Sequence, residues 1–480
     1  MAQQYRTPGV YVEEKSLLPP SVAGVATAVP AFIGYTEKMP VNPVQKVTSL
    51  IEFESIFGKG KEFSIEDGKL KGQEFALYDS VRLYFDNGGG VCFIVSLGAY
   101  PSDPSSIDAT AYKTGLNEVA QLPEVTLIAF PDAATLLSAS DLKAVQDAAL
   151  EQCASLVGRF SILDVQMGTY AASTTPTQII DKDMEEFRKI SMNNLCYGAA
   201  YYPYLKTSYT KDIPFKIVVQ ALGGKIDQGQ NEQGATSDAT DKALQDAVTV
   251  ALKDPDLATT KVEIKNAIAA LDETDNRYTA KLAELKEEAS IIPPSGAVAG
   301  IYVSIDSKVG VWQAPANVGV SGAKDLAIQV NDNQQATMNV DTEGKSVNAI
   351  RYFKGKGILV WGGRTLDGSS NEWRFVPVRR LFSYVEQSVK LATNWVVFQP
   401  NDSNTWIKVK CQISNFLSSL WRSGALAGGS TDEAYFVQVG KDITMTEADI
   451  NEGYLRVRIG LAAVRPAEFI VLEFMHKVQE

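Results

Sequence analysis

The chain has few of the side chains that most enzymes use for acid–base or metal chemistry. Its 480 residues include one histidine, His476, and a Ser-His-Asp or Cys-His catalytic device would have to use it. A zinc site of the common type needs several His or Cys side chains at ligand spacing, and the sequence has none. We therefore expect no metal and no enzyme of these classes. Catalysis by carboxylates alone stays open, because 57 Asp and Glu residues offer many pairs.

Nucleotide-binding loops are missing as well. The stretch FGKGK at 57–61 lacks the first glycine of a P-loop and the Ser or Thr that should follow its lysine. Gly355-Lys356-Gly357 begins like a dinucleotide fingerprint, but Val360 stands where the third glycine belongs. We expect no nucleotide and no other cofactor.

Long hydrophobic runs and a secretory leader are also lacking. The longest apolar stretch, 22–34, is broken by Pro30 and is too short to cross a bilayer. The start MAQQYRTPGVY has no charged segment followed by an apolar one. The four cysteines form no CxxC pair, which is typical of a reducing compartment; they are Cys92, Cys153, Cys196 and Cys411. We expect synthesis in the bacterial cytoplasm and no membrane insertion.

Positive charge is in short supply. The net charge is −12. A protein whose main partner is nucleic acid needs a concentrated basic face, so we expect no nucleic acid partner. The balance is uneven: residues 351–480 carry 16 Lys and Arg against 13 Asp and Glu, or +3, which leaves −15 for residues 1–350. This pattern fits different partners on different faces, and equally a solvated surface of mixed charge.

Buried strands that alternate with helices are present in the first half of the chain. Continuous apolar runs occupy 91–97, 125–132, 160–165 and 195–205, and helical patterns lie at 75–85 and 142–156. Short buried strands separated by helices predict an α/β layer with parallel strands. The fold class is therefore α/β with mixed α+β character.

The second half is more varied. Residues 222–290 carry 14 acidic and 8 basic residues, and they predict a helical insertion on a charged outer surface. Strand patterns follow at 300–312 and 351–366, and later at 433–440 and 454–461. Between them, two amphipathic helices are expected, one opened by Pro377 and one ended by Gly424.

The last sixteen residues, RPAEFIVLEFMHKVQE at 465–480, are apolar on both alternating faces from Ala467 to Met475. Such a strand needs cover above and below, although chain ends usually fray. Fully extended, it reaches ~50 Å, which is far enough to enter another subunit. The alternative is an internal strand of the chain's own sheet. Near the other end, Val10–Glu13 reads as a short strand in a proline-bordered arm.

Four stretches resemble the sheath proteins of contractile phage tails, extracellular contractile injection particles and type VI-like systems. They are YRTPGVYVEE with LPPSVAGVATAVPAFIGYTEK (5–38), PPSGAVAGIYVSIDSKVGVWQAPAN (293–317), FVPVRRLFSYVEQSV with GALAGGSTDEAYFVQVG, and the terminal RPAEFIVLEFMHKVQE. The acidic insertion has no counterpart in this resemblance. The residue patterns and the resemblance together predict seven segments: an amino-terminal arm 1–20, a core segment 21–100, an outer α/β region 101–221, the acidic insertion 222–292, a β-rich region 293–374, a carboxy-terminal sheath domain 375–464 and a carboxy-terminal arm 465–480.

The resemblance also implies a function and its partners. Family subunits polymerise helically around an inner tube, contract, and lend their terminal arms to neighbouring subunits, in phage tails or tail-like particles with baseplate and cap proteins. The arm residues would be Val10, Tyr11, Val12, Glu13, Phe469, Ile470, Val471, Leu472 and Phe474. Three basic residues around the second amphipathic helix, Lys408, Lys410 and Arg422, are candidates for the tube-facing side; solvated lysines are the alternative. A static tube or adhesin protein, or an enzyme, would be a different function for the same chain.

Overall fold

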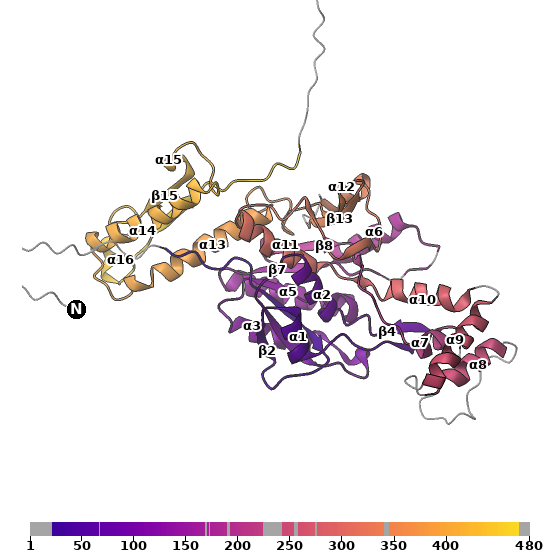
Figure 1. Cartoon of the computed structure of the whole chain (residues 1–480). Coiled ribbons are helices and arrows are strands. Elements are labelled where there is room, and N and C mark those ends of the chain that lie inside the picture. The colour runs from indigo at the N-terminus through magenta and orange to yellow at the C-terminus, as the bar shows by residue number, and fades with distance from the viewer. Residues whose placement is uncertain are drawn as a thin grey trace, which may run out of the picture. The chain divides into compact units, whose positions relative to one another are not determined.

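The computed structural model divides into two compact units. It describes residues 22–66, 68–168, 170–171, 173–189, 193–223, 242–253, 258–273, 276–339 and 345–469. Of these, residues 26–383 and 465–469 form one unit, which we call the sheet unit (Figure 1). Residues 22–25 and 384–464 form the other, the carboxy-terminal unit. Among the described residues no helix combines the length and hydropathy that a membrane span requires.

A nine-stranded sheet is the centre of the sheet unit, with the strand order β11-β14-β13-β8-β7-β6-β1-β5-β2. The strands are β1 (Pro30–Thr36), β2 (Val44–Val47), β5 (Cys92–Ala99), β6 (Leu127–Ala129), β7 (Phe160–Asp164), β8 (Gly198–Tyr202), β11 (Val318–Gly319), β13 (Val347–Phe353) and β14 (Gly357–Val360). A three-stranded sheet has the order β10-β9-β12, with β9 (Leu205–Thr207), β10 (Ile291–Ile292) and β12 (Ala323–Leu326).

The six central strands of the large sheet are parallel, which confirms the predicted α/β layer. β2 pairs antiparallel at one edge, and β14 and β11 at the other. Along the chain, β1 is followed by β5 on one side and then by β6, β7, β8 and β13 on the other. The sheet is therefore doubly wound, and the winding direction reverses between β1 and β6. Strands from three of the predicted segments, 21–100, 101–221 and 293–374, share this one sheet.

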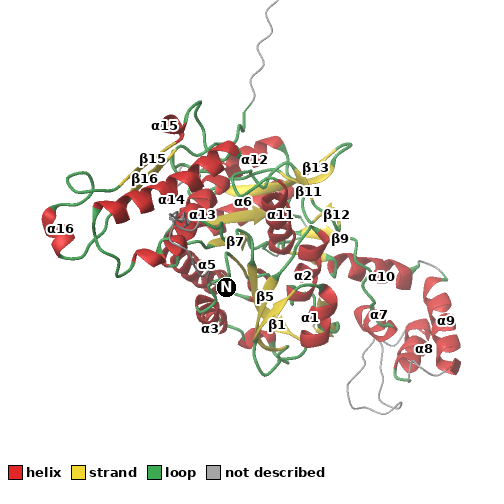
Figure 2. Ribbon diagram, turned by 60° about the vertical axis from the view of Figure 1, so that its left-hand side comes forward, coloured by secondary structure: helices red, strands yellow, loops and turns green. Residues whose placement is uncertain are grey.

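Helices cover both faces of the sheet. Successive residues of a strand point to opposite faces, so Phe32 and Ile33 lie in different cores. Phe32 packs in one core with residues of α1, α2 and α11, and Ile33 packs in another with residues of α3 and α5. Figure 2 shows α1 and α2 on one side of β1 and β5, with α3 on the other. The helices are α1 (Leu50–Phe57), α2 (Leu77–Asp86), α3 (Ala109–Ala120), α4 (Ala133–Leu136), α5 (Ala139–Ser155), α6 (Pro176–Arg188), α11 (Ser295–Lys308) and α12 (Asp332–Asn339), with 3₁₀ turns η1 (Pro104–Ser106) and η2 (Leu195–Tyr197).

The strand predicted at 300–312 is wrong, because residues 295–308 form helix α11. Gly296 and Gly300 lie one helical turn apart and face α2. A Cβ atom on Gly296 would lie 2.2 Å from the carbonyl oxygen of Ser80, and one on Gly300 would lie 2.4 Å from that of Tyr84. The helix is buried on almost every side, so its sequence carries no one-sided helical pattern. Apolar residues at alternate positions therefore resembled a strand.

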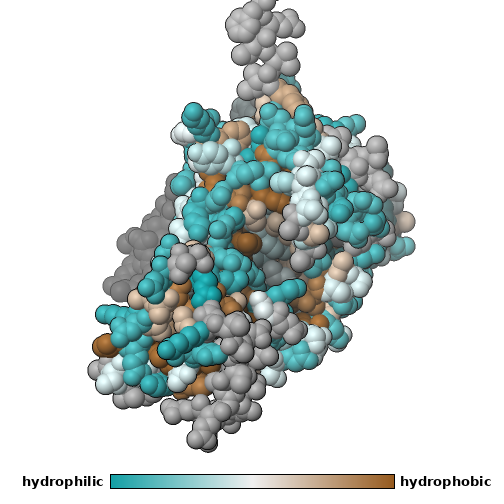
Figure 3. Space-filling view, turned by 90° about the vertical axis from the view of Figure 1, so that its right-hand side faces the viewer, coloured by the Kyte–Doolittle hydropathy of each residue, from teal (hydrophilic) through white to brown (hydrophobic). Residues whose placement is uncertain are grey.

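The described part of the acidic insertion is helical, as predicted, with α8 (Lys242–Ala251), α9 (Ala258–Asp272) and α10 (Arg277–Glu288); α7 (Phe215–Ala221) directly precedes it. Its core is not self-contained: Leu70, on the hairpin β3 (Ser64–Glu66) and β4 (Lys69–Lys71), and Ile213 join the helices in one cluster. Hydrophilic residues cover most of the face seen in Figure 3, with hydrophobic areas between them. The insertion is thus a small lobe that borrows apolar side chains from earlier parts of the chain.

The carboxy-terminal unit contains one of the two predicted amphipathic helices whole and the other from Tyr384 onward. They are α13 (Val376–Ala392), within which the division between the units falls, and α14 (Ser403–Arg422). The remaining elements are η3 (Asn394–Val396), α15 (Thr431–Ala434), β15 (Tyr435–Gln438), α16 (Glu447–Asn451) and β16 (Arg458–Leu461). The strand predicted at 454–461 is shorter than expected, because β16 starts only at Arg458. The helix α16, which a capping box at Thr446 begins, lies shortly before it.

Candidate subunit interface

Most of the predicted arm residues lie outside the described part of the chain: Val10, Tyr11, Val12, Glu13, Ile470, Val471, Leu472 and Phe474. His476 lies outside it too. Phe469 is described, and its side chain is 75% exposed. At the other end, the backbone N–H of Val25 donates to Ser388 Oγ at 3.3 Å, so the amino-terminal segment meets α13 within the carboxy-terminal unit. Strand donation by the arms therefore stays a prediction.

The carboxy-terminal unit holds a sheet of only two strands, β15 and β16. They pair antiparallel, from Tyr435 with Leu461 to Gln438 with Arg458. One face packs on α14, where Val437 is buried and Tyr435 donates its hydroxyl to the Ser414 carbonyl at 3.1 Å. In the part of the chain that the structure describes, no third strand joins this sheet. A two-stranded sheet is marginal by itself, and each strand keeps one edge able to pair with another chain.

Helix α14 carries the three basic residues predicted to face the tube. Its apolar face is buried, as expected, through Val409, Ile413, Phe416, Leu417 and Leu420. Lys408, Lys410 and Arg422 are all exposed. They do not form one cluster, because two residues turn a helix by about 200° and place Lys410 on the opposite flank from Lys408. Arg422 shares the flank of Lys408, but about 21 Å along the axis.

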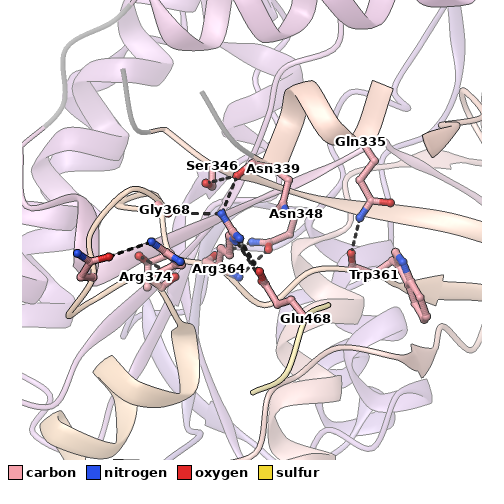
Figure 4. Close-up of polar contacts among 11 residues, drawn as sticks. Gln335, Asn339, Ser346, Asn348, Trp361, Arg364, Gly368, Arg374 and Glu468 are labelled. Atoms are coloured by element: carbon pink, nitrogen blue, oxygen red, sulfur yellow. Dashed lines mark hydrogen bonds and ion pairs between the residues drawn. The ribbon is translucent and has the colours of Figure 1, made fainter. Parts of the chain in front are cut away.

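The carboxy-terminal arm begins with an anchor that we did not predict. The chain leaves the carboxy-terminal unit at Val464, and the next residues belong to the sheet unit. There Glu468 binds Arg364, which follows β14: Nε to Oε1 is 3.0 Å and Nη2 to Oε2 is 2.5 Å (Figure 4). The Arg364 side chain is only 4% exposed and that of Glu468 is 21% exposed. The same guanidinium donates to the carbonyls of Asn339 and Gly368 at 3.3 and 3.4 Å.

Asn348 on β13 holds the backbone of Arg364 in place. Its Oδ1 accepts from the Arg364 N–H at 2.8 Å, and its Nδ2 donates to the Arg364 carbonyl at 2.8 Å. Gly362 permits this approach, since a Cβ atom there would lie 2.7 Å from Asn348 Oδ1. In the sequence, the glycine pair before Arg364 was the one available signal of a close contact, but nothing in the pattern pointed to Glu468, 104 residues away.

Two buried carboxylates accept hydrogen bonds from backbone N–H groups of neighbouring elements of the fold. Asp132 is fully buried and accepts from the backbone N–H groups of Tyr35 at 2.8 Å and Leu77 at 2.6 Å. Asp164 accepts from the N–H of Ser295 at 2.8 Å, at the start of α11. Burial raises the pKa of each carboxyl to about 7, and the hydrogen bonds oppose that rise. Within the described ranges, no group of three His, Cys, Asp or Glu side chains could hold a metal ion.

The chain is similar over nearly its whole length to a solved contractile sheath. It is 30% identical to a sheath chain of an extracellular contractile injection system, the PVC sheath complex in its contracted state. The match covers 99% of each chain, with a TM-score of 0.65. The chain belongs to the contractile sheath family. The resemblance found in the sequence is confirmed by this match.

Other matches agree with this sheath assignment. The sheath protein is 28% identical to the helical sheath of the anti-feeding prophage in its contracted state, over 98% of its own length and all of the other chain, with a TM-score of 0.62. A chain in the baseplate structure of the same particle is also 28% identical, with a TM-score of 0.61 over 99% of this chain and 100% of that one.

A family model matches the carboxy-terminal part of the chain. The family model described as the phage tail sheath C-terminal domain matches residues 369–476. A tail sheath protein of Vibrio phage KVP40 is 22% identical over 156 residues. That alignment spans 32% of the chain and only 22% of the phage protein.

Proposed function

We propose that this sheath protein polymerises helically around an inner tube and contracts to drive the tube through a target envelope. The observation that carries the proposal is the match to contracted sheaths along almost the entire chain. The partners would be further copies of the chain, the inner tube, the baseplate and a cap protein. The subunit would be made in the cytoplasm and act in a phage tail or tail-like particle.

Strand donation would join the copies. The two-stranded sheet β15–β16 offers unpaired edges, and a donated strand adds main-chain hydrogen bonds while alternate side chains fill pockets. Residues 469–480 are twelve residues long, so they reach ~40 Å when extended. That span is ample for an acceptor sheet in a neighbouring copy. The amino-terminal strand, Val10–Glu13, would enter a composite sheet of the same kind.

No nucleotide would be needed for contraction. The extended lattice would be metastable, and release would switch packed interfaces between two discrete arrangements. The sheath would then be a structural protein without catalysis. The buried carboxylate of Asp132 supports this view, because backbone N–H groups of the chain itself donate to both of its oxygens.

The tube contact would involve α14, with charge setting the register rather than the affinity. Its polar side includes Lys408 and Arg422 on one flank and Lys410 on the other. An acidic strip on the inner tube would complement this side of the helix. Figure 2 shows α14 as a long straight helix, which suits a continuous contact.

Negative-stain microscopy of the purified protein, with and without tube protein, tests the proposal. Striated hollow tubes that shorten on release would support it. Smooth fibres that never change length would indicate a static structural protein, and monomers under all conditions would contradict polymerisation. Deleting residues 469–480 or residues 1–14 should leave folded monomers that form no tubes, as measured by sedimentation. Tubes of normal length from either deletion would refute strand donation by that arm.

A further inference from the structure

We infer that the carboxy-terminal arm has two parts with different roles: a fixed root, residues 465–468, and a donated strand that begins at Phe469. Glu468 is the positioning residue that sets the point from which the strand leaves its own subunit. The inference rests on the proposed function, because it concerns the strand that this function donates. The root contributes to the stability of its own subunit, and the strand contributes only to assembly.

The charge balance of Arg364 is the first support. Its guanidinium is 4% exposed, and the carboxylate of Glu468 meets it through two oxygens. The other acceptors, the carbonyls of Asn339 and Gly368, carry no net charge. A buried guanidinium that loses its carboxylate keeps an uncompensated charge, which is strongly unfavourable. Removing Glu468 therefore harms the sheet unit itself.

The rigidity of Arg364 is the second support. Two hydrogen bonds to Asn348 fix its backbone, and Asn348 also donates to the Ala200 carbonyl on β8 at 3.2 Å. Figure 4 shows Arg364 between Glu468 and Asn348, and through Asn348 the carboxylate is tied to two neighbouring strands of the large sheet, β13 and β8. An arm that starts from such a support leaves its subunit at a defined position.

The change at the next residue is the third support. Glu468 is held on the sheet unit, whereas Phe469 is 75% exposed. A large aromatic side chain that its own subunit leaves uncovered is expensive to keep in water and gains by burial elsewhere. Arg465, Ala467 and Glu468 are exposed residues as well, so the ion pair with Arg364, rather than burial, is what marks Glu468 as the anchor within the described part of the arm.

Two truncations separate the roles. Deleting 469–480 keeps Glu468, and deleting 465–480 removes it. Thermal melting of the subunits and sedimentation are measured for both. We expect the shorter deletion to melt like the full-length subunit and the longer one to melt several degrees lower, with loss of polymer in both. Equal melting temperatures would overturn the inference.

A rescue variant distinguishes a charge effect from a general loss of contacts. Arg364→Met removes the buried charge that Glu468 compensates, and replacing a buried ion pair by apolar groups is often neutral. We expect this substitution to restore the melting temperature of the longer deletion and to give no such gain in the shorter one. Failure to restore it would contradict the role of Glu468.

Assembly by the full chain gives a readout beyond stability. We expect Glu468→Gln to lower the yield of polymer even at a temperature where its subunits are fully folded, and Glu468→Asp to recover part of it. The matched control is Asp332→Asn, because Asp332 is 92% exposed in its ion pair with Arg351. Normal polymer yield from folded Glu468→Gln subunits would refute the positioning role. Polymerisation of the chain that lacks 469–480 would contradict strand donation, which belongs to the proposed function. Equal melting temperatures of the two truncated chains would contradict only the anchoring role of residues 465–468.

Discussion

At the scale of single residues, buried polar groups organise the sheet unit. Asp132 follows β6 and reaches both the end of β1 and the start of α2, at the point where the winding of the sheet reverses. Doubly wound sheets generally bind ligands in the crevice at this point. Gly34 permits the arrangement, because a Cβ atom there would lie 2.4 Å from Asp132 Oδ2. In this chain the backbone N–H groups of Tyr35 and Leu77 at this point donate to Asp132.

The raised pKa values of Asp132 and Asp164 predict a pH-dependent stability. In the folded chain the pKa of each carboxyl is about 7, against 3.8 for an ordinary aspartate. Between these values the folded state binds more protons than the unfolded state. The stabilisation is therefore complete below pH ~4 and is lost as the pH rises through ~7. The free energy of unfolding should fall by about 1.4 kcal/mol per pH unit for each carboxyl in this window.

Denaturant unfolding from pH 4 to pH 8 measures this slope. Asp132→Asn should remove its own share of the slope and leave that of Asp164, whatever its effect on the absolute stability, since the amide does not titrate. Glu66→Gln, on the exposed end of β3, is the control and should leave the slope unchanged. An unchanged slope in Asp132→Asn would contradict the assignment.

The contact between α2 and α11 predicts the effect of enlarging one glycine. Gly296→Ala should destabilise the sheet unit by ~1–3 kcal/mol, because the new methyl group meets the Ser80 carbonyl at 2.2 Å. The helix propensity of alanine offsets at most ~1 kcal/mol of this loss. Chemical denaturation is the measurement. Gly90→Ala, where a Cβ atom would meet nothing within 4 Å, should stay close to the parent protein.

At the scale of elements, patterns with one polar side were predicted well, whereas the buried helix α11 was taken for a strand. Helix α14 shows a buried stripe opposite a polar one, so its period was visible in the sequence. Helix α11 lacks a polar stripe. Its sequence pattern therefore resembles that of a strand, and its close packing against α2 through Gly296 and Gly300 is seen only in the fold.

The placement of the basic residues on α14 refines the prediction of a tube contact. We expect Lys408→Glu with Arg422→Glu to abolish assembly on tubes while tube-free polymers still form, because these two side chains share one flank. Lys410→Glu alone should have a smaller effect. Co-sedimentation with tube protein is the measurement, and Lys354→Glu with Lys356→Glu, at the β13–β14 turn, is the control for charge. Equal co-assembly of all variants would refute the contact.

At the scale of the whole molecule, the insertion lobe is linked to the sheet unit through shared apolar side chains. Replacing 224–288 by a Gly/Ser linker should leave polymerisation intact, since the lobe is an elaboration on a charged surface. The deletion also uncovers Leu70, Ile217 and Val218, which pack against the insertion helices. Each such side chain loses ~1.5–3 kcal/mol of burial. We therefore expect poor solubility unless these three residues are made polar at the same time.

Microscopy and sedimentation of both deletion variants check this expectation. Tubes from the variant with polar replacements would support an outer, dispensable lobe. A soluble and folded variant that forms no tubes would place the lobe inside the lattice. The unmodified deletion serves as the comparison, because it differs only in the three uncovered side chains.

The sequence by itself determined the α/β class, the parallel strands, the amphipathic helices and the family. These features depend on local periodicity and on stretches of continuous sequence, which a single chain displays directly. The donated terminal arm stays a prediction, because residues 470–480 lie outside the described part of the chain.

Only the tertiary structure decided which residues meet across long separations. The pair Arg364–Glu468 joins positions 104 apart, and Asp132 joins β1 to α2 from the end of β6. Neither partner carries a local pattern that announces the other. The same holds for α11, whose helix is set by the backbone of α2. Burial, close backbone approach and charge compensation are properties of the packed molecule, so the sequence supplied the residues while the fold determined their partners.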